Sequence, residues 1–203
     1  MLLEPRKRPH QQRSAATVDA ILEAAAHILE RKGLDALTTN AVAELAGVSI
    51  GSLYQYFPGK AAILAELIRR ERLILLAGIE RMAHASGDSL KDDVCLLIRI
   101  AVAHQLLRPG LGRALEYVET TLPLGPETAK LSNEIVQYVA ALLERHGVSE
   151  ATEAARDLVA LAKGMIDAAG IAGESDQRLL VGRVCRAALG YLEYSMPNGN
   201  ELT

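Results

Sequence analysis

The sequence predicts an all-α protein, and three observations lead to this prediction. Half of the 203 residues are hydrophobic, yet only 3% are aromatic, with one Phe and no Trp. Alanine and leucine are abundant, and both favour helices, whereas strands favour aromatic and β-branched side chains. Apolar residues also recur at three-and-four spacing, which is the period of one helix face. We therefore expect packed helices and no strand of significant length.

Composition and charge exclude several classes of protein. The net charge is -3, an ordinary balance for a globular chain. Cys95 and Cys185 lie in apolar stretches without CxxC spacing, so neither a zinc module nor a disulfide scaffold is expected. The N-terminus lacks the apolar core of a signal peptide, and no apolar run reaches the length of a membrane span. We expect a cytoplasmic protein without a membrane anchor, a metal or a cofactor.

The first predicted helix covers about residues 15–32, and Gly33 stands where a left-handed residue would end it. The segment before it is basic, with no acid among its four cations, and two prolines exclude regular structure there. These cations are Arg6, Lys7, Arg8 and Arg13. Two interpretations stay open: an arm for a polyanion, or a solvated tail.

Two short helices are expected next. The first runs from about 39 to 46, with Thr39 as its N-cap and Gly47 as its terminator. The second runs from 50 to 56, with Ser49 as its N-cap, and Pro58-Gly59 ends it. Two helices of this length, joined by roughly three residues, have the spacing of a helix-turn-helix.

The residues around this turn suit two helices that cross near a right angle. Ala43 is small at the crossing, Gly47 can adopt a positive φ, and Val48 and Leu53 supply apolar contacts. Burial does not explain the outward face of the second helix, which carries Ile50, Gly51, Ser52, Tyr54, Gln55 and Tyr56. Small residues let a backbone approach base edges, and hydroxyls donate to phosphate oxygens, so this face fits a DNA groove.

Thr39 and Lys60 each stand at a predicted helix N-terminus, where free N–H groups favour an anion such as phosphate. The alternative is that Thr39 and Ser49 are only caps and that Lys60 is only a surface charge. The whole set, taken together, favours DNA.

The remaining chain predicts further helices at about 60–82, 91–107, 111–121, 126–146, 150–172 and 175–196. The helix at 91–107 is apolar on nearly all sides, which is typical of a helix in the centre of a bundle. Pro109-Gly110 ends it.

The run TTNAVAELAGVSIGSLYQYFPGK, which follows a helix ending in Lys32-Gly33, resembles the DNA-binding domain of the TetR family of transcriptional repressors. The resemblance covers roughly residues 14–66, and the LYQYFPGK segment is its most specific part. It implies three domains or segments: a basic arm at 1–13, a three-helix DNA-binding domain at 14–60 and a larger helical domain for effector binding and dimerisation at 61–203. The implied partner is an operator in double-stranded DNA.

The resemblance also implies roles for single residues. Thr39 and Asn40 would contact the DNA backbone or a base edge, and Ser49 would cap the recognition helix. The residues expected at the DNA are Arg13, Thr39, Asn40, Ser49, Ile50, Gly51, Ser52, Tyr54, Gln55, Tyr56 and Lys60. Tyr54, Tyr56 and Lys60 would hold phosphate, and Arg13 would support binding from the minor groove. Ile50 departs from the family's polar base-readers, and it suits a thymine methyl group.

The larger domain is expected to dimerise and to bind a small molecule. The last two helices carry Ala and Gly at spacings that allow close approach, including Gly182, Ala187 and Gly190, although the same residues suit a core within one chain. Candidate effector-binding residues are Arg99, His104, Tyr117, Tyr138 and Met165. Their mostly apolar surroundings favour a hydrophobic or amphipathic effector, and ordinary packing or snorkelling is the alternative for each.

The sequence shows no machinery for an enzyme. GxSxG, GxGxxG, P-loop and HExxH motifs are absent. Glu23, His27 and Glu30 share a helix face, but such neighbours are common on a solvated helix, and no metal is expected. We expect a homodimeric regulator, a repressor rather than an activator, that an effector releases from a pseudo-palindromic operator. The alternative is a helical protein-interaction module that does not bind DNA.

Overall fold

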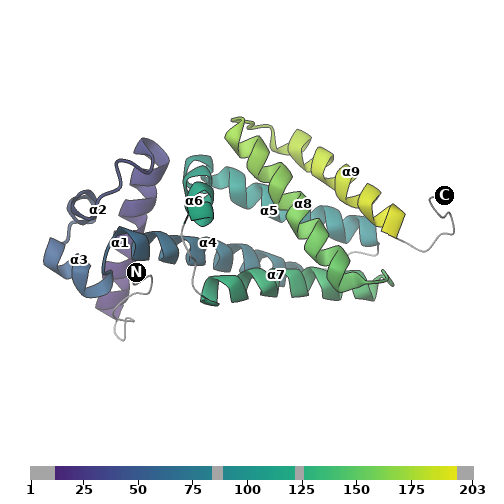
Figure 1. Ribbon diagram of the computed structural model, residues 1–203, viewed down its shortest axis with the longest axis horizontal. Coiled ribbons are helices and arrows are strands. Elements are labelled where there is room, and N and C mark those ends of the chain that lie inside the picture. The colour runs from purple at the N-terminus through teal and green to yellow at the C-terminus, as the bar shows by residue number, and fades with distance from the viewer. Residues whose placement is uncertain (1–11, 84–88, 122–125, 196–203) are drawn as a thin grey trace. The chain divides into compact units, whose positions relative to one another are not determined.

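The computed structural model describes residues 12–83, 89–121 and 126–195, and within these ranges the chain forms nine α-helices (Figure 1). The all-α prediction is confirmed. The helices are α1 (Gln12–Lys32), α2 (Thr39–Leu45), α3 (Ile50–Tyr56), α4 (Lys60–Ala83), α5 (Leu90–Leu107), α6 (Pro109–Thr121), α7 (Pro126–Arg145), α8 (Ala151–Ile171) and α9 (Gln177–Ser195).

The chain divides into two compact units. The first unit holds Met1–Arg72 and Arg108–Ala129, and the second holds Leu73–Leu107 and Lys130–Thr203. The helix α4 therefore contributes its first half to one unit and its second half to the other. The proposed functional boundary at residue 60 stays a prediction, because packing and function need not divide a chain at the same residue.

Most predicted helix boundaries agree closely with the structure, because local signals set them. The bounds of α3 are those predicted, and α1 begins at Gln12 instead of residue 15. The helix α6 begins at Pro109, since a proline at the first helical position lacks only an N–H that would have no partner within the helix.

One predicted cap is wrong. Thr38, not Thr39, is the N-cap of α2: its backbone is extended, and its hydroxyl oxygen accepts a hydrogen bond from the Ala41 amide at 3.1 Å. Thr39 is the first residue of the helix. The N-cap must place its side-chain oxygen near the free amides of the first turn, and Thr38 has the backbone conformation that does so.

The core of the first unit draws on all the helices in it. Fully buried side chains from this core include Ile21, Leu29, Val42, Leu53, Phe57, Ile63 and Leu111. Because α2 and α3 each bury only one or two side chains, their opposite faces are left for other contacts.

The helix α6 packs against α1 within this unit. A Cβ atom added to Gly110 would lie 2.8 Å from the backbone oxygen of Glu30, so the two backbones approach as closely as only glycine allows. The guanidinium of Arg108 donates to Glu30 and to Glu23, each at 3.1 Å. The two carboxylates that were considered as metal ligands therefore hold a guanidinium.

In the second unit, α5 packs against α9 and α8, and α8 also packs against α9 (Figure 1). The core of this unit, to which α7 also contributes, contains Val102, Leu143, Ala155, Leu180 and Val184, all of which are inaccessible to solvent. Although α5 is apolar around most of its surface, it keeps an exposed side with Arg99, Ala103 and Leu107. A smaller cluster joins the second half of α4 to α7 through Leu76, Ile79 and Ile135.

No single helix in the described ranges is long and apolar enough to cross a membrane. The bent pair Leu90–Leu107 and Pro109–Glu119 matches a span in length and composition alone.

Candidate nucleic-acid interface

The turn between α2 and α3 is held by a left-handed glycine. Gly47 has φ of 67°, and its amide donates to the Glu44 carbonyl at 3.1 Å, while the Val48 amide donates to the Ala43 carbonyl at 3.0 Å. Ala43 and Leu53 are buried at the crossing, as predicted. A side chain at position 47 would strain this backbone, so glycine fixes the direction in which α3 leaves the turn.

Ser49 is the N-cap of α3, as predicted. Its hydroxyl oxygen accepts a hydrogen bond from the Ser52 amide at 3.0 Å, and the two serine hydroxyls are 2.8 Å apart. Capping by this serine gives a partner to one of the free amides in the first turn of α3.

The solvent-facing side of α3 is set by the burial of its opposite side. Leu53 is inaccessible in the core, whereas Ile50 is 39% exposed and Tyr54 is 41% exposed. Gly51 and Gln55 are also exposed. An apolar side chain, a glycine, a phenol and an amide thus form a surface along one short helix, which we call the α3 surface.

Two predicted DNA contacts from different helices meet directly. The hydroxyl groups of Thr39, at the start of α2, and Tyr54, in α3, are hydrogen-bonded at 3.1 Å. Asn40 is exposed beside Thr39. Tyr56 and Ser52 are half-buried, and the Tyr56 ring packs against the core of the first unit.

Lys60 stands at the first position of α4, and its ammonium donates a hydrogen bond to the backbone carbonyl of Leu34 at 2.7 Å. This contact links α4 to the loop between α1 and α2. An ammonium has three N–H donors, so two remain for an anion.

The segment of the chain from Thr39 to Tyr56 is poor in charge. It contains no Lys or Arg, and Glu44 is its single acidic residue. Exposed cations lie at its flanks, where Arg31 and Lys32 end α1. Arg13 lies in the first turn of α1, and its side chain, like the rest of the predicted basic arm, is outside the described residues.

The candidate effector residues are divided between the two units. Tyr117 is in α6 of the first unit and is 64% exposed. The other four are in the second unit: Arg99 is exposed on α5, and His104, Tyr138 and Met165 are half-buried.

Among these four, Tyr138 has a partner from another helix. Its hydroxyl, on α7, donates to the Glu80 carboxylate of α4 at 3.2 Å. Partial burial raises the pKa of the Tyr138 phenol, and the hydrogen bond and charge of Glu80 raise it further, with a contribution from Glu134. The phenol is therefore a neutral donor at physiological pH.

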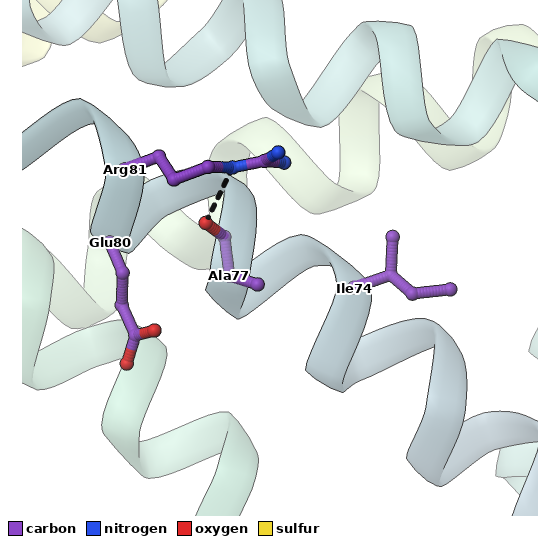
Figure 2. A pocket seen from close by; sticks show the side chains of 4 residues that line it. All are labelled: Ile74, Ala77, Glu80 and Arg81. Carbon is purple, nitrogen blue, oxygen red and sulfur yellow. Dashed lines mark hydrogen bonds between the residues drawn. The ribbon is translucent and has the colours of Figure 1, made fainter.

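An open groove lies along α4. Figure 2 shows its lining residues on α4, Ile74, Ala77, Glu80 and Arg81, with Arg81 donating from Nε to the Ala77 carbonyl at 3.1 Å. The lining residues belong to the second unit and are not among the candidate effector-binding residues.

The predicted dimer helices leave small residues exposed. Ala160, Gly164 and Ala168 follow one another at four-residue intervals on the exposed face of α8, and no atom lies within 4 Å of a Cβ added to Gly164. The same is true at Gly190, whereas Gly182 has the Arg186 guanidinium 3.6 Å away. Ala187 is half-buried.

Sequence reasoning missed two long-range contacts in the first unit: that of Lys60 with Leu34 and that of Arg108 with α1. Each joins residues at least 26 positions apart, and no local pattern signals either one. It also missed Leu45, an apolar side chain on α2 that is 52% exposed.

Both halves of the chain match known family models. Residues 21–67 match the model for bacterial regulatory proteins of the tetR family, and residues 89–192 match the tetracyclin repressor-like C-terminal domain. The second match alone covers more than half of the chain.

Similar proteins agree with these matches. The chain is 34% identical over 98 residues to the nucleoid occlusion factor SlmA of Vibrio vulnificus, covering 48% of this chain and 50% of that protein. It is 34% identical over 104 residues to the HTH-type transcriptional repressor KstR of Mycolicibacterium smegmatis, covering 50% and 51%. The chain thus spans about half the length of these curated relatives.

A solved structure extends the likeness along the whole fold. The crystal structure of a TetR transcriptional regulator from Rhodococcus sp. RHA1 is 26% identical and superposes with a TM-score of 0.66, covering 89% of this chain and 98% of that one. The expectation of a regulator rather than an enzyme is confirmed by these matches. The chain belongs to the TetR family of helix-turn-helix, DNA-binding transcriptional regulators.

Proposed function

We propose that the protein is a homodimeric repressor that binds a pseudo-palindromic operator and leaves it when a small hydrophobic or amphipathic effector binds. The α3 surface is the observation that supports DNA binding most directly. Leu53 is held in the core and Ser49 caps the helix, so Ile50, Gly51 and Gln55 are presented to solvent in a fixed order.

The chemistry of this surface suits the major groove. Gln55 offers both a donor and an acceptor, which is the pattern that adenine presents, and Ile50 offers an apolar contact for a thymine methyl group. Gly51 lets the backbone come close to base edges. Ser52 is half-buried at the start of the same helix and completes the set of proposed base contacts.

Phosphate contacts are assigned to groups around the α3 surface. Thr39 and Tyr54 present a joined pair of hydroxyls, and Asn40 is exposed next to them. Lys60 and Tyr56 are assigned the same role, and Arg13 is assigned to support from the minor groove. These contacts set the position of the protein on the duplex, whereas the side chains in the groove select the sequence.

Dimerisation is assigned to α8 and α9. The exposed small residues Ala160, Gly164 and Ala168 let a second helix approach closely, and Ile171 and Leu179 are large apolar side chains that are 71% and 54% exposed nearby in the chain. A two-fold dimer presents its two recognition helices to half-sites about one helical turn, or 34–36 Å, apart.

Effector binding is assigned to the second unit, with Arg99, His104, Tyr138 and Met165 as lining residues and Tyr117 as a candidate from α6. An effector that favours a dimer unsuited to the half-site spacing weakens DNA binding, and such coupling is typically about 1–3 kcal/mol. Repression is favoured because the relative KstR is named a transcriptional repressor.

Selection from a random pool of duplex DNA tests the central claim. We expect an inverted repeat to be enriched, and Gln55→Ala and Ser52→Ala to change the ranking of bound sequences by about 1–3 kcal/mol. Gln137→Ala, at an exposed position of α7, is the matched control and should leave the ranking unchanged. A pool without an enriched repeat would favour the protein-interaction alternative.

Sedimentation tests the dimer. Gly164→Leu places a large side chain on the exposed face of α8 and should yield monomers, while Ala141→Leu, exposed on α7, should leave the dimer intact. A panel of metabolites added to the protein–operator complex then tests release. We expect the true effector to lower the affinity of the protein for the operator about 5–150-fold. If both leucine variants remain dimeric, the interface lies elsewhere.

A further inference from the structure

The open groove along the second half of α4 combines an apolar face with a cation. Ile74, Ala77 and Arg81 are three or four positions apart, so they share one face of the helix, and all three are exposed. Ile74 is an apolar side chain that is 54% exposed. Glu80 points away from the side on which the Arg81 guanidinium lies (Figure 2). The groove face therefore consists of two apolar side chains followed by one guanidinium.

Packing on its other sides holds this part of α4 in place. Leu76 and Ile79 are buried in a cluster with Ile135 of α7. A Cβ atom added to Gly78 would lie 3.1 Å from Cγ2 of Ile100, so α4 and α5 are in close contact there. The helix is thus held by two neighbours from the second unit, and they leave the groove face open.

Arg81 differs from the other arginines of α4 in its partners. Arg69, Arg70 and Arg72 are each paired with a carboxylate. Among the described residues, no carboxylate is paired with Arg81, and its Nε donates to the Ala77 carbonyl at 3.1 Å. This hydrogen bond holds the guanidinium over the turn that carries Ala77 and uses one of its five N–H donors (Figure 2). The other four donors, on the two Nη atoms, suit an anion.

The groove adjoins the proposed effector site through Glu80. The Glu80 carboxylate accepts a hydrogen bond from the hydroxyl of Tyr138, a candidate effector-binding residue, at 3.2 Å. This contact directs the carboxylate toward α7 and away from the Arg81 guanidinium (Figure 2). The volume of the groove is about 540 Å³. Sites for small molecules commonly measure about 300–1,000 Å³, so the groove has the size of a ligand site.

We propose that this groove binds an amphipathic carboxylate, with the hydrocarbon chain on Ile74 and Ala77 and the carboxylate at the two Nη atoms of Arg81. Two parallel N–H···O bonds are a common arrangement of a guanidinium and a carboxylate. The inference rests on the proposed function. It narrows the effector from hydrophobic or amphipathic molecules in general to amphipathic acids, and it assigns the charged end of the effector to Arg81.

Other classes of ligand fit the groove less well. A cationic amphiphile would bring its charge to Arg81 and be repelled. A neutral, fully apolar molecule would cover the guanidinium without giving its N–H donors a partner, which costs free energy. A phosphate monoester carries a charge of about −1.5 to −2 at neutral pH, whereas Arg81 supplies one positive charge and Glu80 is its neighbour in the chain. A carboxylate carries one negative charge, which Arg81 balances.

Isothermal titration calorimetry of the full-length protein with sodium octanoate, below the concentration at which octanoate forms micelles, tests the proposal. We expect one saturable site per chain. 1-Octanol and octyltrimethylammonium have the same hydrocarbon chain without a negative charge. Each should bind about 10–100-fold more weakly, because the charge-assisted hydrogen bonds to Arg81 are lost. Acetate has the carboxylate without the chain and should not bind at the same concentrations.

Three variants assign the affinity to residues of the groove. Arg81→Gln should lower the affinity for octanoate about 10–100-fold and leave the affinity for 1-octanol unchanged. Ile74→Asn should lower the affinity for both ligands, because both use the apolar face. Arg145→Gln removes an exposed cation at the end of α7 in the same unit, and it is the matched control that should bind octanoate like the native chain. Circular dichroism confirms that each variant is folded.

The proposal is overturned if no saturable binding of octanoate occurs, if Arg81→Gln binds octanoate as tightly as the native chain, or if octyltrimethylammonium binds as tightly as octanoate. Release of the selected operator is measured separately, by fluorescence anisotropy. Octanoate that binds at Arg81 and leaves the operator bound would contradict effector release and support the groove. Release by another metabolite from a protein that does not bind octanoate would contradict the groove and support effector release.

Discussion

The ammonium of Lys60 donates to the backbone carbonyl of Leu34 at 2.7 Å, and this hydrogen bond joins the start of α4 to the loop between α1 and α2. A residue assigned to a phosphate therefore also holds the frame of the helix-turn-helix. Its replacement should affect both folding and DNA binding, and the two effects are separable.

We predict that Lys60→Met lowers DNA affinity about equally for all sequences and reduces the slope of log affinity against log salt by about 1. The free energy of unfolding should fall by about 1 kcal/mol, since the lost hydrogen bond is only partly buried. Fluorescence anisotropy at several salt concentrations and urea unfolding measure the two effects.

Two control variants accompany this test. Lys60→Arg keeps the charge and should retain most of the salt slope, and Lys91→Met, at an exposed position of α5, should change neither quantity. An unchanged salt slope in Lys60→Met would remove Lys60 from the phosphate contacts.

Thr38 and Thr39 are adjacent, yet their side chains have different partners. We therefore predict that their replacement affects stability to different extents. Thr38→Ala removes the cap on the Ala41 amide and should cost about 1 kcal/mol of stability. Thr39→Ala keeps the cap and loses an exposed hydrogen bond to Tyr54, so its cost should be within about 0.5 kcal/mol. Urea unfolding measures both.

DNA binding should reverse this order. Thr39→Ala should weaken operator binding as much as Tyr54→Phe, because either change breaks the same pair of hydroxyls. If Thr38→Ala weakens binding more than Thr39→Ala under conditions where both proteins are folded, the assignment of Thr39 to the DNA backbone is wrong.

Gly110→Ala should destabilise the first unit by about 1–3 kcal/mol, because the added methyl group overlaps the Glu30 backbone and must push α6 away from α1. Gly51→Ala is the matched control within the same unit: its Cβ meets only the Ser49 hydroxyl at 3.9 Å. It should gain up to about 1 kcal/mol from helix propensity. Thermal unfolding followed by circular dichroism distinguishes the two, and equal melting temperatures would contradict the close approach.

Stability should fall at alkaline pH through Cys185. An unfolded cysteine loses its proton near pH 8.5, whereas the folded thiol keeps its proton up to about pH 12 because of burial. Between these values the folded state holds one more proton than the unfolded state, so the free energy of unfolding decreases as pH rises. The contribution is fully present below about pH 8.5.

Urea unfolding between pH 7 and 10.5 measures this dependence under reducing conditions. In Cys185→Ser, the slope of the free energy of unfolding against pH should be smaller by the contribution of one proton. Ser132→Ala, at a half-buried position on α7, should keep the slope of the native chain. Parallel slopes for the native chain and Cys185→Ser would show that Cys185 titrates alike in both states.

The local rules of sequence were sufficient for α3. Ser49 and Pro58-Gly59 delimit seven residues whose bounds the structure reproduces, because a cap and a breaker act within one turn of the helix end. The same rules could not choose between Thr38 and Thr39. Both residue types suit a cap, and the choice depends on which backbone is extended when the preceding loop packs.

Non-local contacts were beyond the sequence patterns. The periodicity of α6 predicts a helix with one apolar face, but it does not say which element covers that face. The packing of Leu111 into the first unit and the clamp of Arg108 on Glu23 and Glu30 both depend on how distant segments fold together.

The scarcity of charge between Thr39 and Tyr56 separates two properties of the proposed complex. Attraction to the polyanion comes from cations outside the reading helices, so changes in ionic strength alter how long the protein stays on DNA. Recognition depends on uncharged amide, hydroxyl and methyl groups, which salt barely affects. When the salt concentration inside a cell rises, the occupancy of every DNA site would fall. The order of preference among the sites would be preserved.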